Sequence, residues 1–174
     1  LKDVFAIQNE IASAIVNRLR LTLGRGQRRY ETNLEAYELY LTARAVVARR
    51  GTSNAQKAAE LFEQVIKTDP AFAPAYAGLA DAYRSLAVGS EMSPTEFFPK
   101  SKTAALKALE LDDSLAEGYA TLGITLMWGE WNWSGAEENF KRAIELDPNN
   151  TNGHLLYAHL LSNLGRHTEA LAEV

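Results

Sequence analysis

One pattern of residues recurs along this chain, and it limits the fold more than any other feature of the sequence. In each of three copies, a helix-like segment ends in Asp-Pro or Asp-Asp, and an aromatic residue or a histidine follows six residues later. These residues are Tyr76, Tyr119 and His154, and Tyr37 begins an earlier and weaker copy. A chain that repeats itself at such an interval is predicted to stack similar structural units along one direction.

Within each copy, the spacing of residues predicts two helices that pack on each other. Large residues recur at positions i, i+3 and i+7 from the aromatic residue, and a small residue stands at i+4, as Ala80, Gly123 and Ala158 do. The large residues form the buried stripe of a helix, and the small residue marks the point where a second helix crosses closely. No segment alternates polar and apolar residues as a strand would, so we predict an all-α fold.

This arrangement resembles the tetratricopeptide repeat (TPR), a helix–turn–helix unit of 34 residues. The resemblance implies an α-solenoid, which is a superhelix of stacked helix pairs. We place the repeat starts at residues 34, 73, 116 and 151, so that the array covers residues 34–174 and the last repeat is truncated. All three intervals exceed 34 residues, the first two by five and nine residues, and we expect the additional residues of these two in loops at 49–54 and 87–93.

Residues 1–33 precede the repeats, and we predict that they form an extra N-terminal helix followed by a basic hinge. Apolar residues keep helical spacing from residue 3 to residue 23. The segment carries six basic and three acidic groups. A solvated helix end accounts for these charges, because cations suit the carboxyl end of a helix. Docking to a neighbouring domain or to an acidic surface is the alternative interpretation.

The ends of two helices also carry recognisable signals. Capping boxes are predicted at Thr32 and at Ser93, each with a glutamate three residues later. Pro99 falls within the helix that the second signal opens. Because proline cannot donate a helical hydrogen bond, we expect a kink there, or a helix that restarts near Phe98.

The segment 3–12, followed by this kind of array, resembles the C-terminal TPR region of multidomain bacterial signalling proteins. The paired tryptophans Trp131 and Trp133 look like the same class. In such proteins a nucleotide cyclase, a protein kinase or a winged-helix DNA-binding domain precedes the repeats. None of these output domains is present in the sequence, so the resemblance assigns none of their activities to this chain.

Composition and motifs argue against chemistry in this chain. The sequence has no cysteine, no phosphate-binding glycine motif and no nucleophile elbow, and its three histidines lack zinc-ligand spacing. We therefore expect no catalytic residue, no metal, no cofactor and no enzyme activity. The formal charge of −4 disfavours nucleic acid as a partner. No stretch approaches the ~20 apolar residues of a membrane span. We expect a soluble segment, cytoplasmic unless an upstream membrane anchor places it in the periplasm.

The TPR resemblance implies a concave groove lined by the first helix of each repeat. Carried over position by position, the partner-binding residues are predicted to be Glu35, Glu38, Asp81, Arg84, Glu117, Ile124, Met127, Trp128, Leu155, His159 and Asn163. This set runs from an acidic entrance to an apolar end, which favours a basic segment with an apolar anchor. Glu38 and Thr42 replace the Lys and Asn by which chaperone-binding TPRs clamp a carboxylate. Trp131 and Trp133 are predicted to pack under a turn instead.

Together these features predict a non-catalytic module for protein–protein interaction or scaffolding in a bacterial signalling or regulatory protein. Its partner would be a peptide or a domain held in the groove. The alternatives are a small-ligand sensor that uses the groove as a pocket, and a structural spacer or self-association unit. Because the last repeat stops inside its second helix, we also expect a weak homodimer through exposed apolar residues such as Leu164 and Leu171.

Overall fold

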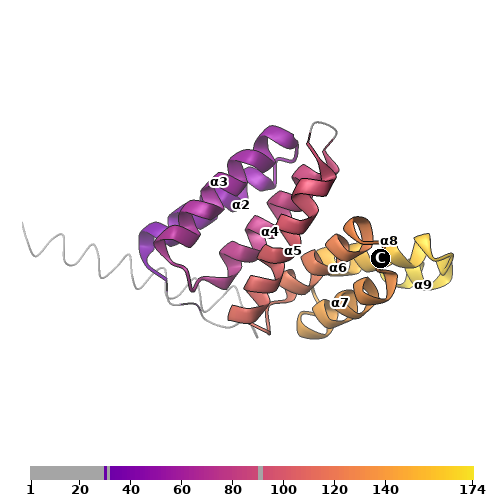
Figure 1. The fold of residues 1–174 in the computed structure, drawn as a ribbon. Coiled ribbons are helices and arrows are strands. Elements are labelled where there is room, and N and C mark those ends of the chain that lie inside the picture. The colour runs from indigo at the N-terminus through magenta and orange to yellow at the C-terminus, as the bar shows by residue number, and fades with distance from the viewer. Residues whose placement is uncertain (1–29, 31, 90–91) are drawn as a thin grey trace, which may run out of the picture. The chain divides into compact units, whose positions relative to one another are not determined.

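A computed structural model of the chain describes residue 30 and residues 32–89 and 92–174 (Figure 1). The chain divides into two compact units, residues 1–30 and residues 31–174, and the description below concerns the second. The predicted leading helix at 3–23 lies outside the described residues, and so does nearly all of the basic hinge.

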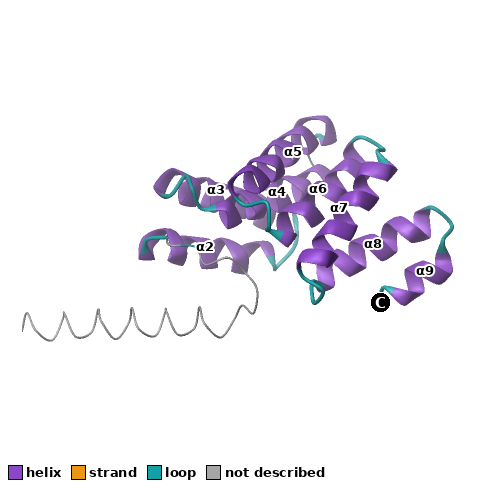
Figure 2. Cartoon of the chain, turned by 90° about the horizontal axis from the view of Figure 1, so that it is seen from below, coloured by secondary structure: helices purple, strands orange, loops and turns teal. Residues whose placement is uncertain are grey.

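Every regular element of the described residues is a helix, and short loops join one helix to the next (Figure 2). The helices are α2 (Leu34–Val47), α3 (Thr52–Thr68), α4 (Ala73–Val88), α5 (Pro94–Leu111), α6 (Ala116–Gly129), α7 (Trp133–Leu146), α8 (Thr151–Asn163) and α9 (His167–Ala172). Each helix packs on the next one along the chain. Helix α4 also packs on α2 and α6, and α6 also packs on α8. The predicted all-α stack of helix pairs is therefore confirmed.

The first helix of each pair begins at Leu34, Ala73, Ala116 or Thr151, the residues chosen above as repeat starts. The additional residues of the long intervals are not confined to loops. Helix α3 has 17 residues and begins at Thr52, inside the predicted loop 49–54, and α5 has 18 residues. Helix α3 extends into the predicted loop because its buried apolar face already begins at Ala55.

Gly123 lies at a close approach of the two helices of the third pair, as the sequence pattern predicts. A Cβ atom at Gly123 of α6 would lie only 2.7 Å from Cε1 of Phe140 on α7. Phe140 is fully buried, and so is its counterpart Phe62 on α3. The ring of Phe62 lies against a second glycine, Gly78 of α4. An aromatic ring therefore lies directly against a helix backbone within the α6–α7 pair, and another does so between α3 and α4 of successive pairs.

Two of the predicted helix ends differ in the structure. Helix α2 is capped by Asn33, whose side chain accepts a hydrogen bond of 2.8 Å from the Ala36 amide, so the capping box predicted at Thr32 is wrong by one residue. Asparagine caps at least as well as threonine, and its position fits the first turn. Ser93 does precede Pro94 at the start of α5, but its hydroxyl pairs with that of Thr95 instead of capping the helix.

Helix α5 runs unbroken through Pro99, so the predicted restart near Phe98 is wrong. Packing holds the helix on the N-terminal side of the proline. The Phe97 ring lies 5.9 Å from that of Tyr83, and Phe98 lies against Gly129 at the end of α6. Tertiary contacts of this kind outweigh the missing hydrogen bond of one proline.

A buried pair of hydroxyl groups joins the three central helices. The Ser101 hydroxyl of α5 donates to the Ala80 carbonyl of α4 at 2.8 Å and lies 2.9 Å from the Thr125 hydroxyl of α6. Thr125 in turn donates to the Thr121 carbonyl at 2.7 Å. The two hydroxyl groups have only two hydrogens for these three contacts, so two of the three are hydrogen bonds at any moment. Both side chains are fully buried, which fixes α5 between α4 and α6.

Candidate partner-binding face

Helices α2, α4, α6 and α8 carry all the residues predicted to bind a partner. Helix α4 packs on α2 and α6, and α6 packs on α4 and α8, so these first helices form one continuous layer. We call the predicted residues on this layer, together with Arg44, the first-helix face. The structure places some of them on the surface, some in the core and some in ion pairs with each other.

Two of the predicted anchors, Ile124 and Met127, are fully buried, so the prediction that they bind a partner is wrong. Both lie on α6, which is packed against helices on either side of it. Neighbouring helices therefore cover residues that a single repeat would leave open. The apolar end of the face is reduced to Trp128, which is half-buried, and to Leu155, which is 54% exposed.

Trp128 and the predicted residues of α8 come together at one end of the face. The indole of Trp128 meets the His159 ring edge to face, with 5.6 Å between the ring centroids and an interplanar angle of 77°. Leu155, His159 and Asn163 follow one another at intervals of four residues, so they lie along one side of α8. All three are exposed. This group offers an aromatic surface, an aliphatic side chain and hydrogen-bonding groups within one patch.

The predicted acidic entrance is largely neutralised by arginines of the chain itself. Nη1 of Arg44 lies 2.7 Å and 2.9 Å from the two carboxylate oxygens of Glu117. Asp81 binds Arg84 of the same helix, at 2.7 Å from Nη2 and 3.0 Å from Nε. The charge gradient inferred from the sequence is therefore wrong for α4 and α6, because each position was considered without its neighbours. Glu35 and Glu38 are exposed and form no ion pair with the other described residues.

Arg44 is the functional candidate that sequence reasoning missed. It lies in the last turn of α2, at a position that the repeat pattern does not assign to the groove. Burial disfavours its charged form, but the nearby charge of Glu117 and further contacts outweigh burial and raise the pKa of the guanidinium. Burial raises the pKa of Tyr40 to about 12, so this phenol stays neutral beside the arginine. The face therefore keeps one permanent cation held between α2 and α6.

Within the last repeats, a second charge cluster joins α7 and α8 to the turn that precedes α9. Oε1 of Glu137 lies 2.8 Å from Nζ of Lys141, 2.9 Å from Nη1 of Arg166 and 3.0 Å from the Tyr157 hydroxyl. Hydrogen bonds from Lys141 and then Arg166 lower the pKa of Glu137 to about 2. This cluster is structural, since it ties the final helix pair to the repeat before it.

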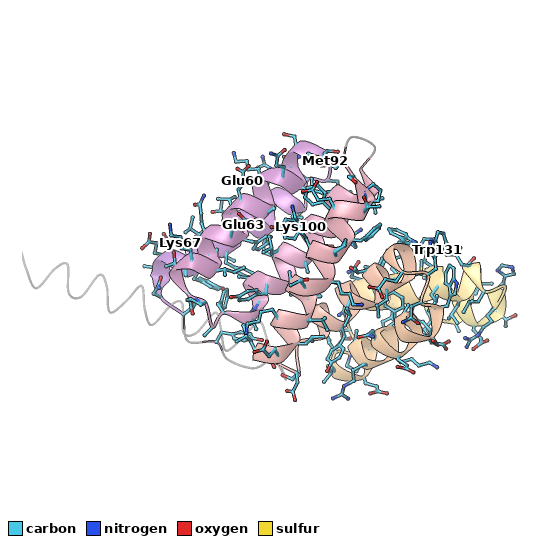
Figure 3. All side chains as sticks on the ribbon, in the orientation of Figure 1. Glu60, Glu63, Lys67, Met92, Lys100 and Trp131 are labelled. Atoms are coloured by element: carbon cyan, nitrogen blue, oxygen red, sulfur yellow. The ribbon has the colours of Figure 1, made fainter. Side chains whose placement is uncertain are left out.

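The turn between α6 and α7 exposes an aromatic ring that the sequence analysis expected to be packed. Trp131 is 68% exposed and has a φ of 55°, so the packing predicted for it is wrong (Figure 3). The left-handed backbone of this turn directs the side chain to solvent, beside its neighbouring tryptophan. The centroids of Trp131 and Trp133 are 5.7 Å apart, and Trp133 is half-buried as the first residue of α7.

Within the described ranges, no three histidine, aspartate or glutamate side chains gather as the ligands of a metal ion would. Among the same residues, no helix combines the length and the apolar character that crossing a bilayer requires.

Comparison with known proteins agrees with this geometry. Residues 139–172 match the family model of the tetratricopeptide repeat. A protein of Rhizobium meliloti (strain 1021) named "Putative adenylate cyclase 3" is 33% identical over 137 residues, which are 74% of this chain. The chain spans 23% of the length of that relative. The relative agrees with the resemblance to cyclase-linked TPR regions that the sequence suggests.

Solved structures share the fold at lower sequence identity. TTC0263, a thermophilic TPR protein of Thermus thermophilus, is 21% identical and superposes with a TM-score of 0.70, over 79% of this chain and 70% of that one. The first TPR of Spaghetti (RPAP3), solved with the HSP90 peptide SRMEEVD, is 18% identical with a TM-score of 0.58, over 75% of this chain and 93% of that one. The described part of this chain thus has the α-solenoid fold of tetratricopeptide-repeat proteins.

Proposed function

We propose that this chain is a non-catalytic interaction module of a signalling protein, and that a partner segment binds across the first-helix face. The observation that carries the proposal is the patch of Trp128, Leu155, His159 and Asn163. A half-buried indole held edge-on by an exposed histidine, beside an exposed leucine, is the arrangement expected of an anchor for an apolar side chain. The exposed acids Glu35 and Glu38 on α2 favour a partner that also carries basic residues.

The comparisons support this proposal at the level of the fold. A TPR structure that superposes on this chain was solved with a peptide bound. The cyclase-named relative supports a place in signalling, because this chain would correspond to about a quarter of such a protein. Neither comparison identifies the partner, so its chemistry is inferred here from the face alone.

Self-association is a second candidate, and a separate observation favours it. Leu164 at the end of α8 and Leu171 in α9 are exposed, the latter by 76%, and Val174 is exposed beyond them. Apolar side chains gathered at one end of a solenoid favour burial against a second surface. A two-fold dimer through α8 and α9 would bury the same patch of both copies.

Phage display of random 12-residue peptides tests the interaction directly. We expect selected peptides to combine a basic residue with an apolar anchor. We expect Trp128→Ala to weaken their binding by about 1–3 kcal/mol, which is roughly 5- to 150-fold in affinity. Leu106→Ala is the matched control, because Leu106 is a large exposed apolar residue of α5 outside the face. Peptides that bind Trp128→Ala as tightly as the wild type would contradict the proposal. A parallel thermal-shift screen with metabolites would reveal a small-ligand sensor instead.

A further inference from the structure

The ion pair between Arg44 and Glu117 joins two helices that do not pack on each other. The residues are 73 positions apart, in the last turn of α2 and the first turn of α6. Helix α4 lies between these helices and packs on both. The ion pair therefore spans a whole repeat across the first-helix face.

This ion pair is well formed but open to solvent. One guanidinium nitrogen donates to both oxygens of the carboxylate, yet the two side chains remain 43% and 44% exposed. Exposed ion pairs contribute little stability, since water solvates the separated charges almost as well. The ion pair can therefore open without leaving a buried charge behind.

Glu117 would stay an attractive anion after Arg44 leaves it. Its carboxylate lies in the first turn of α6, where the positive end of the helix dipole favours a negative charge. Glu117 and Trp128 are 11 residues apart on α6, which is about three turns, so both point to the same side of the helix at a separation of about 16 Å. Ile124 lies between them but is covered by the protein. A partner would thus touch α6 at two points.

We propose that Glu117 receives a basic side chain of the partner, and that Arg44 occupies this carboxylate in the free chain until the partner displaces it. This inference rests on the proposed function and specifies its partner. An extended segment advances about 3.3 Å per residue and its side chains alternate between two faces, so two side chains on one face that must span about 16 Å are about four or six residues apart. The partner motif is therefore an arginine followed or preceded, about four or six positions away, by a large apolar residue. Arginine is favoured over lysine because its planar fork matches a carboxylate.

If Arg44 occupies the Glu117 carboxylate in the free chain, removal of Arg44 from the binding face should strengthen the binding of the partner. A ligand that must displace Arg44 binds with an affinity reduced in proportion to the fraction of chains in which the ion pair is open. Since exposed pairs are weak, we expect Arg44→Gln to tighten binding by roughly two- to fivefold. Glu117→Gln should weaken binding instead. Arg142→Gln is the matched control, because it removes the same charge from an exposed ion pair, with Glu145, that lies within α7 and outside the first-helix face.

The probe is a synthetic peptide, acetyl-Gly-Arg-Gly-Ser-Gly-Ser-Gly-Trp-Gly-amide, in which arginine and tryptophan are six positions apart. A second peptide with the two residues only two positions apart tests the spacing. Binding is measured by calorimetry or NMR titration at fixed ionic strength. The first peptide is expected to bind better than the second, and Arg44→Gln is expected to tighten the first while Arg142→Gln leaves it within the error of the wild type.

The opening of the ion pair can be measured without any ligand. The chain contains no cysteine, so Ala45→Cys on α2 and Ser162→Cys on α8, both exposed, accept one spin label each. We expect a longer or broader label distance in Arg44→Gln, and a return to the wild-type distance in the charge swap Arg44→Glu with Glu117→Arg. The swap also separates a lost ion pair from a misfolded variant.

The outcomes distinguish this inference from the function on which it rests. If phage-selected peptides bind through Trp128 but Arg44→Gln neither tightens them nor changes the label distance, the displacement of Arg44 is refuted and the function stands. If no selected or synthetic peptide binds the wild type or any variant, both are refuted. Tighter binding in Arg44→Gln, weaker binding in Glu117→Gln and a changed label distance would support the displacement.

Discussion

Substitution of Gly123 tests the seam of the third helix pair, and the cost can be worked out from the structure. The Cβ of Gly123→Ala would lie 2.7 Å, 2.8 Å and 3.1 Å from three ring carbons of Phe140, all too short for carbon–carbon contact. Phe140 is fully buried, so its ring cannot swing away into solvent. Overpacking of this kind costs about 1–3 kcal/mol, and the better helix propensity of alanine returns about 1 kcal/mol. We therefore expect a net loss of at most about 2 kcal/mol for Gly123→Ala, and a larger loss for Gly123→Leu.

A double-mutant cycle decides whether this contact is the cause. Phe140→Leu alone should cost about 1–2 kcal/mol through the cavity that it leaves. In the double variant, the smaller side chain makes room for the new methyl group, so the combined loss should fall short of the sum of the two single losses by about 1 kcal/mol. Urea unfolding followed by far-ultraviolet circular dichroism measures all four proteins. Full stability of Gly123→Leu, or strict additivity of Gly123→Ala with Phe140→Leu, would refute the close crossing.

The remaining predictions concern other parts of the array. The contribution of Glu137 to stability is complete above its ordinary pKa of 4.5 and is lost as the pH falls toward 2. Glu137→Gln should therefore cost about 1–2 kcal/mol at pH 7, and the variant should lose less stability than the wild type on acidification. Equal acid sensitivity of the two proteins would contradict this. Ser101→Ala should cost about 1 kcal/mol, since the Ala80 carbonyl loses a buried donor; a neutral effect by thermal melting would mean that Thr125 satisfies the site alone. Sedimentation at several concentrations should reveal a weak dimer that Leu164→Glu with Leu171→Glu abolishes, whereas a strict monomer would reject the second candidate function.

The helices were predictable from the sequence because they depend on contacts between residues close in the chain. The spacing of large and small residues located the start of every first helix and the close crossing at Gly123. The errors lie where a local rule competed with packing. Pro99 should interrupt α5 by its own chemistry, but the packing of Phe97 and Phe98 holds the helix together. Asn33 and Thr32 are both good capping residues, and only the geometry of the first turn decides between them.

The candidate face was less predictable because it depends on how successive repeats lie against one another. A positional rule assigns the same role to a residue in every repeat, but burial differs along the array. Met127 is fully buried on α6, whereas Asn163 on α8 is exposed. Trp131 is exposed instead of packed because its backbone adopts a left-handed conformation. The sequence pattern does not indicate such a conformation for a bulky residue.

The ion pair between Arg44 and Glu117 on the first-helix face also depends on contacts between repeats. Glu117 and Arg44 are 73 residues apart, and no motif within one repeat relates them. Their meeting depends on α4, which packs on both α2 and α6. A partner that binds Glu117, as proposed above, would therefore depend on the packing of successive repeats as well as on the residues of one repeat. An array whose internal ion pair competes with its ligand would bind weakly at rest and more strongly once another domain or ligand had opened it.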